Sequence, residues 1–179
     1  MPNFRRKKLS GGYYFFTVVT YKRQRFLTDE TARRCLRNVW QHVCEKRPFK
    51  TIAICLMPEH IHCIWKLPDG DFDYSTRWSL IKRGFTQQWL KAGGFEANQT
   101  LSRIKKGRRG VWHRRFWEHC LRDEEDLSEH IRYIHYNPVK HKLVEKPSDW
   151  KWSTFHRFEY AGGLDAIGNM QVGDMLSGE

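Results

Sequence analysis

Apolar residues follow two patterns along the chain, short runs typical of buried strands and spacings of three and four typical of helices. Short apolar runs rich in aromatic and β-branched residues predict strands over residues 13–21, 50–57, 61–67 and 116–121. Apolar residues at spacings of three and four predict helices over residues 30–46, 75–92 and 124–136. The expected order of elements is therefore β-α-β-β-α-β-α.

The ends of the expected helices carry recognisable signals. Gly93-Gly94 closes the second helix, as glycine commonly does at a helix C-terminus. The third helix is expected to stop before Asn137-Pro138, because the residue before a proline disfavours the helical region. Residues 93–110 are expected to form a loop. The order of elements predicts an α+β fold, a ferredoxin-like antiparallel sheet with helices packed on one face.

Length and composition fit one globular domain, which we expect to cover residues 1–160 before a glycine-rich tail over residues 161–179. The chain has 179 residues, of which 40% are hydrophobic and 15% aromatic, so it can bury a sizeable core. Its longest apolar runs are too short to span a bilayer, and the start MPNFRRKKLS lacks a secretory signal. Five cysteines without a CxxC pair predict reduced thiols in a cytoplasmic protein.

The formal net charge of +12 favours a polyanionic partner, most often nucleic acid. The cations cluster near the start of the chain and again after residue 100. The candidate DNA-binding residues are Arg5, Arg6, Lys7, Arg103, Lys105, Lys106, Arg108, Arg109, Arg114 and Arg115. Trp112, Phe116 and Trp117 lie within the second cluster, either as rings that stack on unpaired bases or as core residues.

Two histidines lie two residues apart in the motif PEHIHCIW, at the start of an expected strand. Residues two apart on a strand point to the same face, so His60 and His62 would present two imidazoles side by side. Two neutral imidazoles suit a divalent metal and leave coordination positions open for substrate oxygens. The alternative is a pair of surface histidines on a hairpin, because the His-x-His spacing is unspecific by itself.

The second candidate group is the motif YIHYNP. Tyr133 and Asn137 lie four residues apart, so a helix would place them on one face, where they could bring a phenol and a carbonyl oxygen to one metal. A tyrosine near its free pKa of about 10 is a poor nucleophile and needs a poised partner. The alternative is that Tyr133 only packs and that Asn137 only ends the helix before Pro138.

Four segments together resemble the REP-associated tyrosine transposases, a branch of the one-tyrosine HUH transposases. The segments are FRRKKLSGGYYFFTVVTY, MPEHIHCIWKLP, RRFWEHCLRDEEDLSEHIRYIHYNPVKHKLV and DWKWSTFHRF. They span nearly the whole chain in the order that the family has them. Their occurrence together is far more specific than any single motif.

The resemblance implies a role for each residue of the two candidate groups. His60 and His62 match the metal-binding histidine pair, Tyr133 matches the nucleophile and Asn137 matches the third metal ligand. Related insertion-sequence transposases often have glutamine at that third position. Tyr136, one turn away on the same helix, is the rival nucleophile, but the Tyr-x-x-x-Asn spacing favours Tyr133.

The resemblance also implies the reaction and the substrate. The expected enzyme is a metal-dependent single-strand DNA endonuclease that uses Mg²⁺ or Mn²⁺. It nicks and rejoins DNA beside palindromic repeat hairpins through a covalent 5′-phosphotyrosine intermediate. The resemblance leaves the oligomeric state open between a monomer and a homodimer. Related insertion-sequence transposases are dimers, whereas the palindrome-associated branch is thought to act with a single active site in one chain.

Other classes of protein fit the residues less well. A non-catalytic module that binds single-stranded nucleic acid could have the same fold, but the aromatic strand signature of RNA-recognition domains is absent. A zinc hydrolase or deaminase is disfavoured because HExxH, PCxxC and HxE motifs are all absent.

Overall fold

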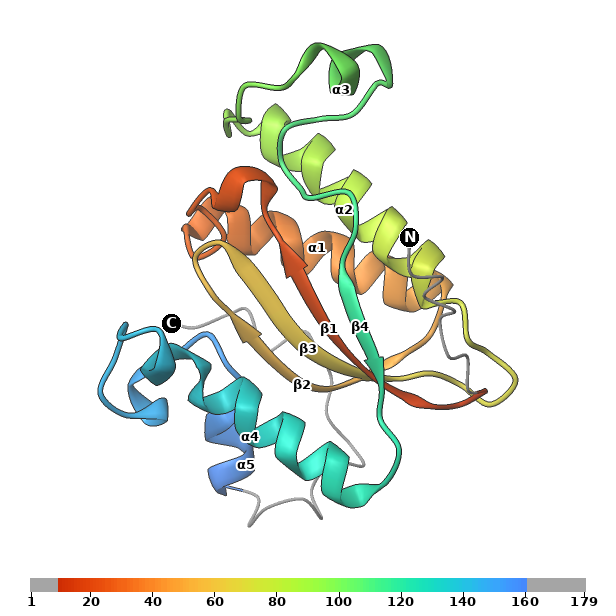
Figure 1. Ribbon diagram of the computed structural model, residues 1–179, viewed down its shortest axis with the longest axis vertical. Coiled ribbons are helices and arrows are strands. Elements are labelled where there is room, and N and C mark those ends of the chain that lie inside the picture. The colour runs from red at the N-terminus through yellow and green to blue at the C-terminus, as the bar shows by residue number, and fades with distance from the viewer. Residues whose placement is uncertain (1–9, 161–179) are drawn as a thin grey trace.

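Four antiparallel strands form the sheet at the centre of the computed structural model, which describes residues 10–160 (Figure 1). The strands are β1 (Tyr13–Val19), β2 (Lys50–Leu56), β3 (His60–Lys66) and β4 (Trp117–Cys120). Their order in the sheet is β2-β3-β1-β4, and each neighbouring pair is antiparallel. This is the ferredoxin-like α+β arrangement that the order of elements predicted.

The helices lie on both faces of this sheet, whereas the sequence led us to expect them on one. They are α1 (Glu30–Lys46), α2 (Tyr74–Lys91), α3 (Leu101–Lys105), α4 (Glu124–Lys140) and α5 (Phe155–Tyr160), with short 3-10 turns η1 (Tyr21–Arg23) and η2 (Pro147–Asp149). Figure 1 shows α1 and α2 behind the sheet and α4 and α5 in front of it. The strands explain the difference, because β1 buries Tyr14 and Phe16 on one face and Phe15 on the other. A sheet that is apolar on both faces needs cover on both.

Three tryptophans pack against one another in the core under α1 and α2. Trp65 of β3 stacks on Trp78 of α2, with ring centroids 4.5 Å apart, and Trp40 of α1 meets both rings edge-on. All three side chains are fully buried. Gly84 lets α1 and α2 approach closely, because a Cβ at this position would lie 2.8 Å from a methyl group of Val39.

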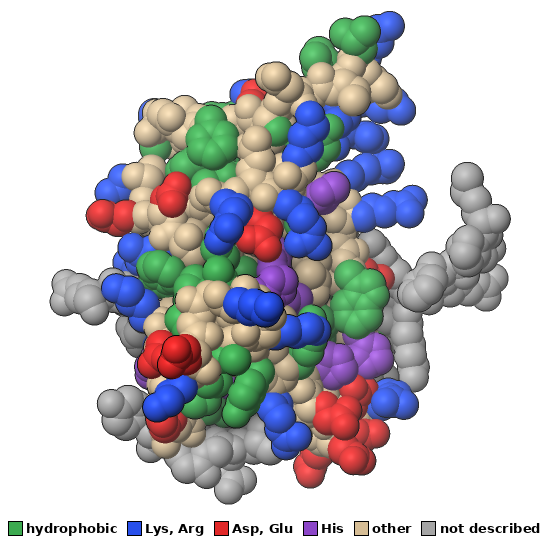
Figure 2. All heavy atoms as spheres, turned by 60° about the vertical axis from the view of Figure 1, so that its left-hand side comes forward, with side chains coloured by type: hydrophobic (Ala, Val, Ile, Leu, Met, Phe, Trp, Pro, Cys, Tyr) green, Lys and Arg blue, Asp and Glu red, His purple; other side chains and the backbone are tan. Residues whose placement is uncertain are grey.

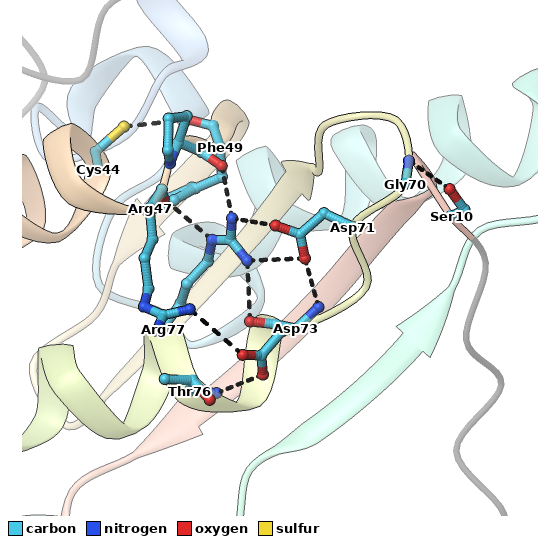
Figure 3. A network of polar contacts seen from close by, with 10 residues as sticks. Ser10, Cys44, Arg47, Phe49, Gly70, Asp71, Asp73, Thr76 and Arg77 are labelled. Carbon is cyan, nitrogen blue, oxygen red and sulfur yellow. Dashed lines mark hydrogen bonds and ion pairs between the residues drawn. The ribbon is translucent and has the colours of Figure 1, made fainter.

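A buried arginine at the start of α2 holds together the segments around it (Figure 3). The Arg77 guanidinium donates to both carboxylate oxygens of Asp71, at 3.1 and 2.6 Å, and to the carbonyl oxygens of Arg47, Pro48 and Asp73. It thereby joins the start of α2 to the turn between α1 and β2. Arg77 is 2% exposed, so loss of Asp71 would leave a buried cation short of partners, at a cost of about 3–5 kcal/mol.

The segment that follows α4 attaches this helix to β2. Trp150 donates from its indole nitrogen to the Leu56 carbonyl at 3.0 Å, and the Thr154 hydroxyl donates to the Ile54 carbonyl at 3.2 Å. The same hydroxyl accepts a hydrogen bond from Nε2 of His135, a buried residue of α4, at 3.0 Å. These bonds fix the position of α4 over the front face of the sheet.

Helix α4 does not end before Asn137-Pro138, as expected, but continues to Lys140. A proline lacks the backbone N–H, so Pro138 removes one donor from the last turn. The bond from the His141 N–H to the Asn137 carbonyl, at 3.0 Å, nevertheless closes the helix normally. Pro138 is itself buried, and its packing offsets the lost hydrogen bond. The expected loop over residues 93–110 likewise contains the short helix α3.

Two further expectations about the chain can be compared with the structure. No helix among residues 10–160 is long and apolar enough to cross a membrane. All five cysteines are free thiols. The expected tail over residues 161–179 lies outside the described part of the chain.

Candidate active site

His60 and His62 lie at the start of β3, on the face of the sheet that α4 covers. Their side chains point to the same side, as the spacing predicted, and their Nε2 atoms lie 3.0 Å apart. Both are nearly inaccessible, at 3% and 4% exposure, so they are not surface histidines of a hairpin.

The other nitrogen of each ring has a polar partner. Nδ1 of His60 donates to Oε1 of Glu59 at 3.1 Å, which leaves the Nε2 atom of His60 with a lone pair. Nδ1 of His62 lies 2.9 Å from the Thr17 hydroxyl on β1, which can accept its hydrogen in the same way. Such partners orient metal-binding histidines and fix their tautomers.

Asn137 reaches the same point from α4. Its side chain is fully buried and close enough to both imidazoles to raise their pKa values, yet neither Oδ1 nor Nδ2 makes a hydrogen bond of ordinary geometry among the described residues. An orphaned amide is costly in a protein interior, by about 1–3 kcal/mol. A group that binds here would restore the missing interaction.

Burial keeps the two imidazoles neutral. It lowers the pKa of His62 to about 2, helped by the nearby His60, His141 and Lys140, and it also lowers the pKa of His60. Neutral imidazole is the form that binds metals. Two ligand atoms that each lie about 2.1 Å from one ion, at a right angle to one another, are about 3.0 Å apart. The distance between Nε2 of His60 and Nε2 of His62 is the same, 3.0 Å. The two histidines and the amide oxygen of Asn137 therefore fit a divalent cation.

Tyr133 lies one turn before Asn137 on α4, beside the histidine pair. Its ring meets the His62 ring edge-on, with centroids 5.3 Å apart, and 41% of the residue is exposed. Tyr136 instead lines a shallow hollow with Glu129, Arg132 and Tyr133, and no ring contact joins it to either histidine within residues 10–160. The geometry therefore places Tyr133, rather than its rival, at the site.

Two residues at the end of α4 complete the surroundings of the site, and sequence reasoning missed both. The Lys140 ammonium lies over the Tyr133 ring, 5.0 Å from its centroid, and the His141 ring lies 5.3 Å from that of His60. Lys140 is two turns after Tyr133, so the spacing would have indicated a shared helix face. Ending the predicted helix before Pro138 concealed that relationship.

A pocket of about 510 Å³ opens next to Tyr133. It is lined by Phe15, Thr17, Trp117, Glu129, His130 and Tyr133. The pocket therefore brings together residues of β1, β4 and α4 at the point where the phenol is exposed.

A separate histidine cluster lies at the start of α4. His119 and His130 each direct a ring nitrogen at Asp126, 3.0 Å from its carboxylate, and the three residues have a spacing that could hold a metal. Nε of Arg122 also lies 3.0 Å from that carboxylate. The positive charge of this guanidinium would repel a metal cation bound at Asp126. Hydrogen bonding to Asp126 therefore explains the cluster better than metal binding.

The predicted DNA-binding cations divide into three groups. Arg5, Arg6 and Lys7 lie outside the described residues. Arg103, Arg108, Arg109 and Arg114 line a hollow of about 720 Å³ between α2 and the chain that precedes β4. Lys105, Lys106 and Arg115 are exposed close by in the sequence. Figure 2 shows Lys and Arg side chains along the upper right edge of the molecule and acidic side chains at its lower right.

Two of these cations also bind partners within the protein. Arg109 forms a two-pronged ion pair with Glu96, with its closest contact at 2.6 Å. The Arg103 guanidinium lies 3.9 Å from the Tyr21 ring centroid and donates to the Arg109 carbonyl at 2.8 Å. Lys82, which sequence reasoning did not single out, also lines the hollow, and burial and Arg103 lower its pKa to about 8.

The three aromatic residues of this region have different environments. Trp112 is buried at 5% exposure and Phe116 packs against the core under α1 and α2. Trp117, by contrast, is 51% exposed on β4. The sequence allowed these rings to be either stacking surfaces for bases or core residues, and Trp112 and Phe116 are core residues.

Comparison with known proteins identifies the family to which this fold and site belong. Residues 8–137 match the family described as "Transposase IS200 like". The REP-associated tyrosine transposase of Escherichia coli (strain K12) is 41% identical over 168 residues, covering 93% of this chain and 90% of the relative. A Haemophilus influenzae protein provisionally named as a REP-associated tyrosine transposase is 45% identical over 159 residues, covering 88% and 87%.

A solved structure points the same way. A REP-associated tyrosine transposase bound to a REP hairpin has a TM-score of 0.75 with 39% identity, covering 100% of this chain and 98% of that one. The chain therefore belongs to the REP-associated tyrosine transposases, a family of enzymes that cleave and rejoin DNA.

Proposed function

We propose that this chain is a metal-dependent single-strand DNA endonuclease that nicks and rejoins DNA beside palindromic repeat hairpins, with Tyr133 as its nucleophile. One observation carries the proposal: Asn137 of α4 meets His60 and His62 of β3 at a buried point, and Tyr133, one helix turn away, lies against His62 at its edge. A structural role gives no reason for two neutral imidazoles and an unsatisfied amide to converge beside an exposed phenol.

The chemistry follows from this arrangement. The Tyr133 oxygen attacks the scissile phosphorus and displaces the 3′ oxygen of the preceding nucleotide, so the 5′ phosphate becomes bonded to tyrosine and the phenol proton passes to solvent. The reverse attack by a 3′ hydroxyl rejoins DNA and releases the tyrosine. Because one phosphoester replaces another, the energy of the broken bond is retained for rejoining.

His60, His62 and Asn137 would hold Mg²⁺ or Mn²⁺. When bound, the ion supplies Lewis-acid polarisation of the scissile phosphate and stabilises the charge that develops there. The protein's own groups position the reactants: Thr17 and Glu59 orient the imidazoles, and Lys140 places a positive charge beside the attacking phenol.

The substrate follows from the charge of the chain and from its relatives. The exposed cations around α3 suit the phosphates of a hairpin, and a related transposase has been solved with a REP hairpin bound. Among the candidates, Lys105, Lys106, Arg114 and Arg115 are exposed, whereas Arg103 and Arg109 already bind partners within the protein.

The proposal is tested with a labelled hairpin oligonucleotide that carries single-stranded flanks. The purified protein is incubated with it in Mg²⁺, in Mn²⁺ and in chelator, and the products are resolved on a denaturing gel. We expect metal-dependent cuts in the flank, lost in Tyr133→Phe and retained in the matched control Tyr136→Phe. Tight binding without cutting, in both metals and with several palindromes, would instead indicate a non-catalytic binding module.

A further inference from the structure

Trp117 is a large apolar residue on the edge strand of the sheet, yet half of it is exposed. Its predecessor Phe116 faces the α2 side and packs against the core, whereas Trp117 lines the pocket beside Tyr133 on the opposite face. Its ring meets Phe15 edge-on, with centroids 5.5 Å apart. Tyr133, which is 41% exposed, lines the same pocket, so the two rings form a shared exposed aromatic surface of the kind that marks a binding site.

The surroundings of Trp117 hold it in place. Its ring stacks on His119 at 5.9 Å and 18°, and His119 stacks on His130 at 5.0 Å and 21°. Both histidines are bonded to Asp126, which is 4% exposed. The histidine cluster at the start of α4 therefore supports the tryptophan as a rigid platform.

Asp126 keeps its charge in this position. Burial by itself would raise the pKa of its carboxyl, but hydrogen bonds from Arg122 and His119 outweigh that effect and lower the pKa to about 2. The platform is therefore preorganised before any ligand enters, which reduces the ordering cost of binding.

We propose that this pocket binds an unpaired nucleobase of the substrate strand, next to the phosphate that Tyr133 attacks, and that Trp117 is the surface on which this base stacks. The inference rests on the proposed function, because it takes the occupant from the strand that Tyr133 would cleave. Aromatic walls with a polar rim are the usual way in which proteins hold single-stranded bases, whereas a paired base is already stacked in its duplex.

The chemistry of the lining favours a base over another occupant. Phe15, Trp117 and Tyr133 offer ring surfaces, while Thr17, Glu129 and His130 offer hydrogen-bonding groups for a base edge. The pocket volume of about 510 Å³ accommodates one base with part of its sugar. The phosphates themselves would stay near Lys140 and the histidine pair, outside these aromatic walls.

The test is a thermodynamic cycle measured by binding rather than by cleavage. Hairpins with one abasic nucleotide at each flank position in turn are titrated, by fluorescence anisotropy, with Tyr133→Phe protein and with the Tyr133→Phe/Trp117→Ala double variant. At one position next to the cleavage site, we expect the abasic change to weaken binding about tenfold to the first protein and hardly at all to the second.

Three controls keep the outcome decisive. Trp117→Phe should restore most of the effect, because it retains a ring. Trp117→Leu keeps apolar bulk on β4 without a ring, and it should behave like Trp117→Ala if stacking matters. Phe95→Ala removes an equally exposed ring, 50% exposed, from the α2 end of the molecule and should change nothing in the cycle.

The proposal would be overturned if the abasic change and Trp117→Ala weakened binding independently at every flank position. It would also be overturned if the Trp117→Leu protein lost as much affinity as the parent when the base is removed. Either result would leave Tyr133 cleavage untouched, because the cycle measures binding alone. Conversely, cutting by the Tyr133→Phe protein in the same samples would contradict the proposed nucleophile but not the base pocket.

Discussion

The rings of Tyr133 and His62 meet edge-on with their centroids 5.3 Å apart, although the two residues come from different layers of the fold. His62 belongs to β3 in the sheet, and Tyr133 belongs to α4, which covers that sheet. The contact depends on the segment after α4, which bonds to β2 through Trp150 and Thr154. The position of Tyr133, the proposed nucleophile, is therefore set by packing remote from the candidate site.

Because the Asn137 amide makes no ordinary hydrogen bond within the described residues, we expect its loss to affect metal binding much more than the stability of the fold. In Asn137→Ala, we expect cleavage to fall at least about tenfold, because the proposed metal ligand is lost. The metal-free variant should lose little stability, since the amide that it lacks makes no hydrogen bond of ordinary geometry among the described residues. Thermal unfolding with and without Mn²⁺ checks both, because Mn²⁺ should raise the Tm of the parent and barely change that of the variant. An unchanged Mn²⁺ shift would show that Asn137 is not a ligand.

The bond between Thr17 and Nδ1 of His62 predicts a role for a hydroxyl that never contacts the metal. In Thr17→Val, we expect Mn²⁺ affinity to fall about tenfold, as is usual when a partner of a metal-binding histidine is removed. Isothermal titration calorimetry measures that affinity directly. The matched control is Thr86→Val, whose hydroxyl bonds the Lys82 carbonyl on the other face of the sheet. Equal affinities for the two variants would count against the orienting role.

The Lys140 ammonium over the Tyr133 ring predicts an effect on the cleavage step. In Lys140→Ala, we expect single-turnover cleavage to slow about tenfold, because a cation no longer offsets negative charge at the phenol and phosphate. Lys140→Arg should retain most activity. Lys142→Ala is the control, since Lys142 is exposed and lies just beyond the helix. A rate for Lys140→Ala as high as that of the control would exclude this role.

The buried His135 predicts a loss of stability in acid. Burial lowers its pKa to about 4, whereas the unfolded chain binds the proton near 6.5. Both states are neutral above 6.5, so stability falls as the pH drops from 6.5 towards 4, by on the order of 3 kcal/mol for this residue. His60 and His62, also neutral in the fold, act in the same direction.

Urea denaturation of the metal-free protein at several pH values measures this dependence. His135→Gln keeps a group that can bond the Thr154 hydroxyl but does not titrate, so its stability should depend less steeply on pH between 6.5 and 4. Identical slopes for the parent and the variant would mean that His135 does not contribute.

The sequence predicted the strands from runs of aromatic and β-branched residues, and the shared face of His60 and His62 from their two-residue spacing. The uninterrupted apolar run of β1 puts large apolar side chains on both faces, and this should have predicted helices on both sides of the sheet. Lys140 and His141 were missed because a local rule about Pro138 was given more weight than the buried packing that carries α4 past it.

Some features of the site lie beyond pattern reasoning altogether. The two-residue spacing puts Trp117 and His119 on one face of β4, but no spacing indicates that Asp126 of α4 ties His119 to the helix. The ion pair between Arg109 and Glu96 likewise depends on how the loop folds. Such contacts arise only when segments distant in sequence come together.

The central claim is that Tyr133 forms the covalent bond to DNA, and the most direct measurement is to locate that bond. A hairpin substrate with a short flank is reacted in Mn²⁺, the protein–DNA adduct is isolated and digested with protease and nuclease, and the modified peptide is sequenced by mass spectrometry. We expect a 5′-phosphonucleotide on Tyr133, and no adduct in Tyr133→Phe. A modification on Tyr136, or cleavage without any adduct, would contradict it.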